Sequence, residues 1–146
     1  MFLRKICFFC FLCVILSHIS YAQELTAAEA VNYYNEGVRA QKNGDFDTAM
    51  KAYQKALLLS SYYNKFCLNN QAAIYAQVGD YKRAEALLKE VIAMDPDYMP
   101  AKLNLGLIYD SYGDKKKALE FWAEVFQIEK RKPKTFVADA EQSAPK

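Results

Sequence analysis

The sequence is poor in the side chains that most catalytic and metal sites need. It has a single histidine, His18, and four cysteines among 146 residues. The histidine and three of the cysteines lie within the first 22 residues, so the chain from residue 23 onward keeps only Cys67. Such a chain can form neither an internal disulfide, nor a His/Cys zinc site, nor a histidine-activated nucleophile. We therefore expect no catalytic residues, no metal site and no cofactor.

An excess of charge of either sign is also lacking. The chain has 19 basic and 17 acidic residues, for a net charge of +2. That balance gives no positive field of the kind that attracts nucleic acid, so we expect no nucleic-acid partner. With 53% apolar and 25% charged residues, the composition is that of an ordinary globular protein and is not that of a disordered chain.

The first residues have the pattern of a secretory signal peptide. Arg4 and Lys5 precede an uninterrupted apolar run over residues 6–16, and Ala22 ends a Ser-Tyr-Ala sequence that suits a signal peptidase. We expect cleavage after residues 1–22, which places the protein beyond the inner membrane, in the periplasm of a bacterium with two membranes. The alternative is an uncleaved anchor, although the run is shorter than the about 20 residues that span a bilayer. After cleavage no stable membrane anchor would remain.

A glycine–aspartate pair recurs along the rest of the chain. The pairs begin at Gly44, Gly79 and Gly113, with spacings of 35 and 34 residues. A small residue precedes each of these glycines by seven residues, an alanine follows by five, and a large residue follows that alanine by four. These columns are Gly37, Ala72 and Gly106; Ala49, Ala84 and Ala118; and Tyr53, Leu88 and Trp122. A fixed period of this length is typical of repeat architectures.

Each repeat has the pattern of two helices joined by a turn. In the first repeat, apolar residues recur at three- and four-residue steps over 27–43 and over 47–59, and the Gly44 turn separates them. Thr26 and Glu29 have the spacing of a capping box, so residues 23–29 are expected to be a lead-in and helix cap. The small columns are expected where two helices approach closely. We predict an all-α fold, an α-solenoid of three helix–turn–helix units.

This pattern resembles the tetratricopeptide repeat family. The third repeat is closest to the family's pattern, with Leu105, Gly106, Tyr109, Gly113, Asp114, Ala118 and Trp122 in place. The first repeat departs from it at Glu36, where a leucine is usual, and at Ser60-Ser61, which replace an Asp-Pro stop. The resemblance covers three repeats, residues 30–63, 65–98 and 99–132. The polar residues 133–146 are expected to form a flexible tail.

The resemblance implies a scaffold or adaptor whose concave groove binds a protein or peptide partner. The family's groove positions fall here on Tyr34, Val38, Gln41, Asn69, Asn70, Ala73, Gln77, Leu103, Asn104, Leu107 and Asp110. A well-known variant of the groove clamps a carboxylate with lysine, asparagine and arginine. Of the matching positions Tyr34, Val38, Asn70, Pro100 and Asn104, only Asn70 fits, so we expect apolar and amide contacts instead. Ordinary surface or inter-repeat packing is the alternative role for any of these residues.

A second surface is expected at the end of the last repeat. Phe126 and Ile128 occupy columns that meet the next repeat elsewhere in the chain, but no fourth repeat follows. Exposed large apolar residues commonly mark an interface, so this end is expected to bind a second copy or a partner. Alternatively, Phe136 and Val137 fold back over it. A homo-oligomer is thus possible, and the alternative function is a self-assembling structural subunit.

Overall fold

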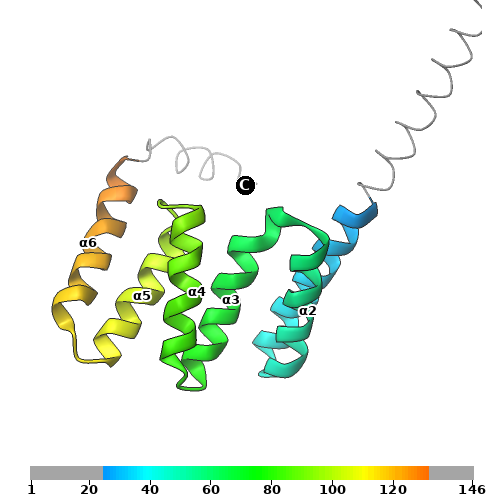
Figure 1. The fold of residues 1–146 in the computed structure, drawn as a ribbon, viewed down its shortest axis with the longest axis horizontal. Coiled ribbons are helices and arrows are strands. Elements are labelled where there is room, and N and C mark those ends of the chain that lie inside the picture. The colour runs from blue at the N-terminus through cyan, green and yellow to red at the C-terminus, as the bar shows by residue number, and fades with distance from the viewer. Residues whose placement is uncertain (1–24, 132–146) are drawn as a thin grey trace, which may run out of the picture. The chain divides into compact units, whose positions relative to one another are not determined.

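The computed structural model describes residues 25–131, and within that range the chain is helical and contains no strand. A helix over residues 25–42 comes first, followed by the elements that Figure 1 labels. These are α2 (Phe46–Leu59), the 3-10 helix η1 (Ser61–Tyr63), α3 (Asn64–Gln77), α4 (Tyr81–Met94), α5 (Met99–Ser111) and α6 (Lys115–Arg131). The predicted all-α class is confirmed. The predictions for residues 1–22 and 133–146 lie outside the described residues.

The first helix begins earlier than the sequence pattern suggested. Residue 25 is already helical, so Thr26 and Glu29 lie inside the helix and Thr26 is not its N-cap. Two alanines between them, Ala27 and Ala28, are strong helix formers and favour continuation of the helix toward the N-terminus. The lead-in assigned to residues 23–29 is therefore corrected: its described part, residues 25–29, belongs to the helix.

The recurring glycine–aspartate pair has a direct structural reason. The glycines end one helix in the left-handed region, with φ of +77° at Gly44, +83° at Gly79 and +80° at Gly113, which glycine adopts without steric cost. The aspartate that follows caps the next helix. Oδ1 of Asp45 accepts a hydrogen bond from the backbone N–H of Thr48 at 3.1 Å, and Asp80 and Asp114 accept equivalent bonds. The turns predicted at these glycines are confirmed.

The glycines in the first helix of two repeats make room for aromatic rings. A Cβ atom placed on Gly37 would lie 2.6 Å from the ring of Tyr53. On Gly106 it would lie 2.0 Å from Nε1 of Trp122. Real carbon atoms do not approach so closely, so each ring packs on bare backbone. The sequence predicted close approach here, and the structure shows that a ring, not a second backbone, is what approaches.

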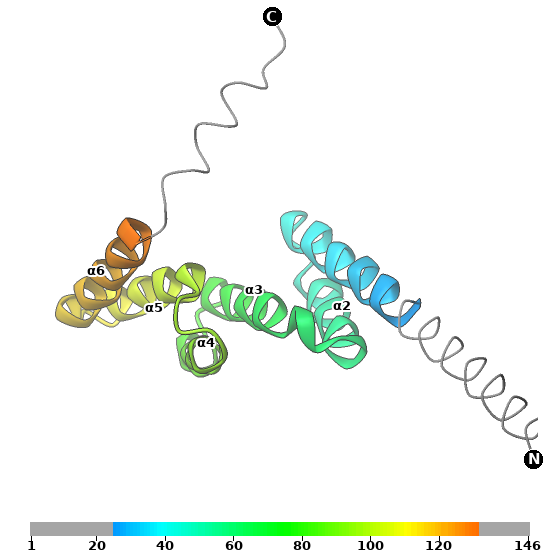
Figure 2. The same ribbon diagram turned by 90° about the horizontal axis from the view of Figure 1, so that it is seen from above.

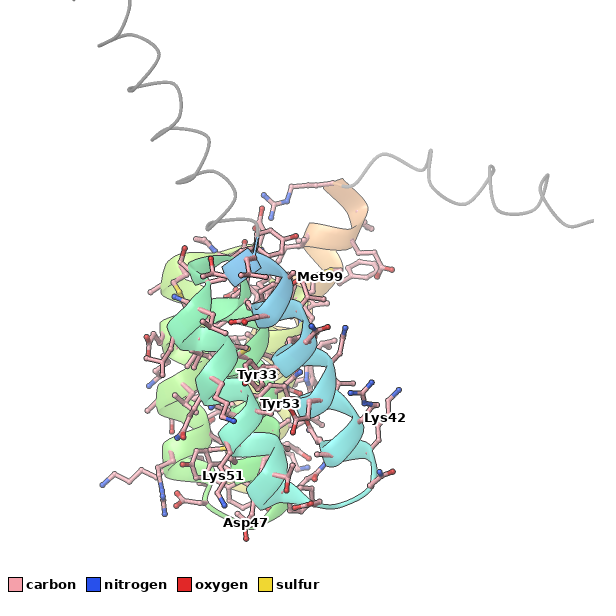
Figure 3. All side chains as sticks on the ribbon, turned by 90° about the vertical axis from the view of Figure 1, so that its right-hand side faces the viewer. Tyr33, Lys42, Asp47, Lys51, Tyr53 and Met99 are labelled. Carbon is pink, nitrogen blue, oxygen red and sulfur yellow. The ribbon has the colours of Figure 1, made fainter. Side chains whose placement is uncertain are left out.

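The chain divides into two compact units after Gln71. The first unit contains the helix over 25–42, α2, η1 and the first half of α3, and Figure 3 shows Tyr53 in its middle. The second contains the rest of α3, α4, α5 and α6; Figures 1 and 2 show α5 and α6 as an adjacent pair. Large buried side chains fill each unit: Tyr53 and Cys67 in the first, and Leu88, Val91, Leu105 and Ile108 in the second.

Proline is placed where a helix tolerates it. Pro100 lies in the first turn of α5, where its missing N–H needs no partner. The preceding helix, α4, ends at Met94 and is followed by Asp95 in an extended conformation.

None of the helices within residues 25–131 combines the length and the apolar character needed to cross a bilayer.

Candidate partner-binding site

An apolar hollow opens in the second unit, between the end of α3, α4 and α5. Its volume is about 200 Å³. Its lining consists of Ala72, Ala73, Ala76, Gln77, Tyr81, Leu88, Asn104, Leu107, Ile108 and Ser111. Four of these, Ala73, Gln77, Asn104 and Leu107, are predicted groove residues. The structure therefore brings together, in one concave site, residues that the sequence selected from two different helices.

Short side chains on α3 leave the space for this hollow. Ala72, Ala73 and Ala76 form its α3 wall, while the buried side chains of Leu88 and Ile108 contribute apolar surface from α4 and α5. No charged residue belongs to the lining. Its polar groups include the Ser111 hydroxyl, which donates to the backbone carbonyl of Leu107 at 2.9 Å. The site is thus suited to apolar contact with a few amide hydrogen bonds.

The apolar surface continues from the hollow along α5. Leu103 and Leu107 lie one turn apart on this helix, and they are 44% and 59% exposed. Asp110, another predicted groove residue, is exposed and pairs with Lys115, whose Nζ lies 3.2 Å from Oδ1. Its negative charge is therefore partly offset. Exposed leucines beside a hollow form the kind of surface that marks an interface.

In the first unit, three predicted groove amides belong to one hydrogen-bond network around Tyr53. The Tyr53 hydroxyl donates to Oε1 of Gln41 at 2.8 Å and accepts from Nδ2 of Asn70 at 3.1 Å. Nδ2 of Asn69 donates more weakly to Oδ1 of Asn70, at 3.4 Å. These amides serve internal packing, which is the structural alternative that the sequence left open for them. The other two predicted residues of this unit, Tyr34 and Val38, are half-buried.

Burial suppresses ionisation at the centre of the first unit. It raises the pKa of Tyr53 to about 12, although the hydrogen bond from Asn70 opposes the shift. It also raises the pKa of the Cys67 thiol to about 12. Both groups are therefore neutral at physiological pH. Cys67 is a buried core residue and has neither the exposure nor the positive surroundings of a reactive thiol.

Sequence reasoning missed an aromatic cluster at the junction between α2 and α3. The rings of Tyr34 and Tyr63 have centroids 5.2 Å apart, as do those of Tyr62 and Tyr63, and Phe66 lies 5.9 Å from Tyr62. Tyr62 is 71% exposed. The available signal was the Tyr-Tyr pair beside the one extra residue near Asn64, where the repeat pattern is irregular. The junction adds exposed aromatic surface to the first unit.

The predicted end face is only partly as expected. Phe126 is 53% exposed, and Nζ of Lys130 lies 4.5 Å from its ring centroid. Ile128 is 4% exposed and is therefore a core residue, so its assignment to an exposed face is wrong. Phe126 and Ile128 are two positions apart in the sequence, so their side chains differ by about 200° around the axis of α6. One therefore points outward and the other inward. The exposed apolar partner of Phe126 on α6 is Leu119, at 62%.

Charged residues of the second unit are paired around another cavity, of about 430 Å³. Its lining is Asp97, Lys102, Glu120, Ala123, Glu124, Gln127, Ile128 and Arg131. The Lys102 ammonium pairs with Glu124, and Nη2 of Arg131 lies 3.1 Å from Oδ1 of Asp97. Among the described residues, no group of three or more His, Cys, Asp and Glu side chains is arranged to hold a metal ion.

Comparison with known proteins agrees with the repeat pattern. Models described as tetratricopeptide repeat match residues 30–63 and 75–130. Photosystem I assembly protein Ycf3 of Synechococcus sp. (strain CC9605) is 34% identical over 87 residues, which are 58% of this chain and 50% of that protein. The Ycf3 of Rippkaea orientalis (strain PCC 8801 / RF-1) is 28% identical over 118 residues, covering 70% and 68%. The chain spans about half the length of the Synechococcus relative.

Solved structures share the fold. The crystal structure of MamA has a TM-score of 0.64 and 22% identity, covering 73% of this chain and 61% of that one. The first TPR of Spaghetti (RPAP3), bound to the HSP90 peptide SRMEEVD, has a TM-score of 0.65 and 21% identity, covering 73% and 85%. The Sgt2 TPR domain from Aspergillus fumigatus has a TM-score of 0.63 and 27% identity, covering 70% and 68%.

Proposed function

We propose that this chain, which belongs to the tetratricopeptide repeat family, is an adaptor that holds a protein or peptide partner through the apolar hollow of its second unit. The observation that carries the proposal is that groove residues predicted from the sequence coincide with residues that line the hollow in the structure. The resemblance to the tetratricopeptide repeat family assigned Ala73, Gln77, Asn104 and Leu107 to the partner-binding groove, and the same four residues line the hollow. A fold alone does not define a function, so the site carries the argument.

The similar proteins support an adaptor role of this kind. Two TPR structures of similar fold hold an HSP90 peptide, and the curated relatives are named as assembly proteins. We propose a different peptide chemistry for this chain. The positions that match the family's carboxylate clamp are Tyr34, Val38, Asn70, Pro100 and Asn104, and none of them is cationic. An acidic peptide tail would therefore find no charge partner at these positions.

The proposed location is the bacterial periplasm, and the proposed role is non-enzymatic. The location is supported by the basic and apolar pattern of residues 1–22. The non-enzymatic role is supported by the absence of histidine from residue 23 onward. Mass spectrometry of the protein recovered from cell fractions tests the location. A mature chain that begins at Gln23 in the periplasmic fraction is expected, and an uncut chain in the cytoplasm would contradict it.

A second candidate function, self-assembly, rests on α6. Leu119 and Phe126 are exposed by 62% and 53% and lie two turns apart on the same helix, so they share one face. The Lys130 ammonium lies over the Phe126 ring, yet both apolar side chains remain more than half exposed. A second copy that packs there would make the protein a structural subunit, in addition to or in place of an adaptor.

Both functions are tested by capturing a partner from envelope extract. The capture uses the full-length protein and a reversible cross-linker. The informative variants are Leu107→Glu in the lining of the hollow and Leu119→Glu on α6, which replace exposed leucines on helices of the same unit. We expect a partner that is lost with Leu107→Glu and kept with Leu119→Glu. Equal capture by both variants would contradict the adaptor site. Recovery of this chain alone, lost with Leu119→Glu, would favour self-assembly.

A further inference from the structure

We infer that the hollow of the second unit is a socket for one uncharged apolar side chain of the partner, of aliphatic or phenyl size. This inference rests on the proposed function and adds the chemistry of the group that is recognised. It is drawn from the size of the hollow, the uncharged character of its lining, and its continuity with the exposed leucines of α5.

The size fits a single side chain. The hollow has a volume of about 200 Å³. An apolar cavity of roughly 150 Å³ accepts a molecule as large as benzene. An isobutyl group or a phenyl ring therefore fits, and the hollow has no room for two such groups. The space exists because α3 presents Ala72, Ala73 and Ala76, whose methyl groups reach only a short way toward α5.

The lining favours an uncharged occupant. Most of the hollow is aliphatic, and its polar groups are the amides of Gln77 and Asn104, the Ser111 hydroxyl and the phenol of Tyr81. A carboxylate or an ammonium group that entered it would lose water without gaining a charge partner, which is costly. Ionised side chains elsewhere in this unit include two ion pairs, in which Asp110 pairs with Lys115 and Lys102 pairs with Glu124.

The surroundings indicate how the rest of the partner is held. Leu103 and Leu107 extend the apolar surface beyond the hollow along α5. Gln77, at the end of α3, is exposed at the rim, and its amide offers both a donor and an acceptor to a peptide backbone. The partner segment is therefore expected to place its apolar residue in the socket and an uncharged backbone stretch beside Gln77.

The test uses the full-length protein, labelled with ¹³C at its methyl groups, and titrates it with capped amino acids. The probes are N-acetyl-leucinamide, N-acetyl-phenylalaninamide and, as the charged control, N-acetyl-aspartate. We expect saturable shifts at Leu88, Leu107 and Ile108 with the two apolar probes, with a Kd on the order of millimolar for such small ligands. N-acetyl-aspartate is expected to leave these methyl signals unchanged at the same concentration.

A matched pair of variants assigns the binding to the socket. Ala73→Leu fills the hollow from α3, whereas Ala93→Leu makes the same change at an exposed position of α4 outside the lining. We expect Ala73→Leu to weaken the apolar probes about tenfold, because the new side chain occupies their space, and Ala93→Leu to have no effect. Circular dichroism and thermal unfolding show whether both variants are folded.

Several outcomes would overturn the socket. Absence of saturable shifts, equal binding of N-acetyl-aspartate, or equal binding by Ala73→Leu and wild type would each contradict it. Partner capture separates this failure from that of the proposed function. A partner that is lost with Leu107→Glu but kept with Ala73→Leu would leave the adaptor function standing without the socket. If neither variant affects capture, both proposals fail.

Discussion

The hydroxyl of Tyr53 donates a hydrogen bond to Oε1 of Gln41 across the first unit, at 2.8 Å. It also accepts one from Asn70, so a single buried phenol joins α2 to the helices on either side of it in sequence. Two of the three residues were selected from the sequence as partner-binding. Their amides are held in place by Tyr53, which makes the network a determinant of stability in this unit.

Tyr53→Phe tests that role. The variant keeps the ring that packs on Gly37 but removes both hydrogen bonds, and we expect a loss of about 1 kcal/mol in the free energy of unfolding. The measurement is urea denaturation followed by circular dichroism. Tyr62→Phe is the matched control, because Tyr62 is largely exposed, and it should change the midpoint very little. Equal effects of the two variants would show that the network contributes nothing specific.

Gly106→Ala tests the contact between bare backbone and Trp122. The added methyl group would lie 2.0 Å from Nε1 of the indole, so the ring must move, and overpacking of this kind costs about 1–3 kcal/mol. Combining Gly106→Ala with Trp122→Leu should recover part of the loss, because the smaller side chain leaves room for the methyl group. Thermal unfolding followed by circular dichroism compares the three variants. Additive losses in the double variant would contradict the proposed contact.

The pH dependence of stability should include a contribution from Glu85. Hydrogen bonds from Lys89 and from the Tyr109 hydroxyl, which lies 2.7 Å from Oε1, hold the pKa of this carboxyl below its usual value of 4.5. A carboxyl with a lowered pKa in the folded state stabilises the fold above its unfolded pKa. That contribution is lost as the pH falls through the folded pKa.

Glu85→Gln should therefore reduce the acid sensitivity. We expect the urea midpoint of the wild type to fall more steeply below pH 4.5 than that of the variant, and the two profiles to run in parallel near neutral pH. Glu120→Gln is a suitable control, because Glu120 is exposed on α6. Profiles of the same steepness for wild type and Glu85→Gln would contradict this account.

Cys67 should resist alkylation while the protein is folded. Its side chain is fully buried, and burial raises the pKa of its thiol to about 12, so almost no thiolate is present at pH 8. Iodoacetamide labelling followed by peptide mass spectrometry measures the alkylation of Cys67 separately from that of the three N-terminal cysteines. Labelling is expected only after urea is added. Rapid labelling of the folded chain would show that the first unit opens readily.

The repeat pattern predicts the turns well because their chemistry is local. A turn with a glycine at positive φ and a capping aspartate requires two adjacent residue types, which are recognisable in the sequence, as at Gly44 and Asp45. The first helix is different, because Thr26 has the right neighbours for a cap and yet lies inside the helix. A local signal for a helix start does not determine whether the chain before it is helical as well.

The candidate site could be predicted only in part. The groove positions that the family resemblance implies were enough to select Ala73 and Leu107. They do not show where the side chains of several helices fail to fill the space between them, so the hollow itself required the structure. Ile128 was misassigned because its column was treated as equivalent in all repeats, although in α6 it turns into the core.

The central claim is that the partner binds at the hollow of the second unit and not on the outer face of α6. Photo-cross-linking from single p-benzoylphenylalanine residues, placed at position 107 or at position 119 of the full-length chain in cells, tests it most directly. Both positions hold exposed leucines, so the photoreactive residue is accommodated equally. We predict a discrete adduct with another protein from position 107 and none from position 119. Adducts only from position 119, or only between copies of this chain, would contradict the account.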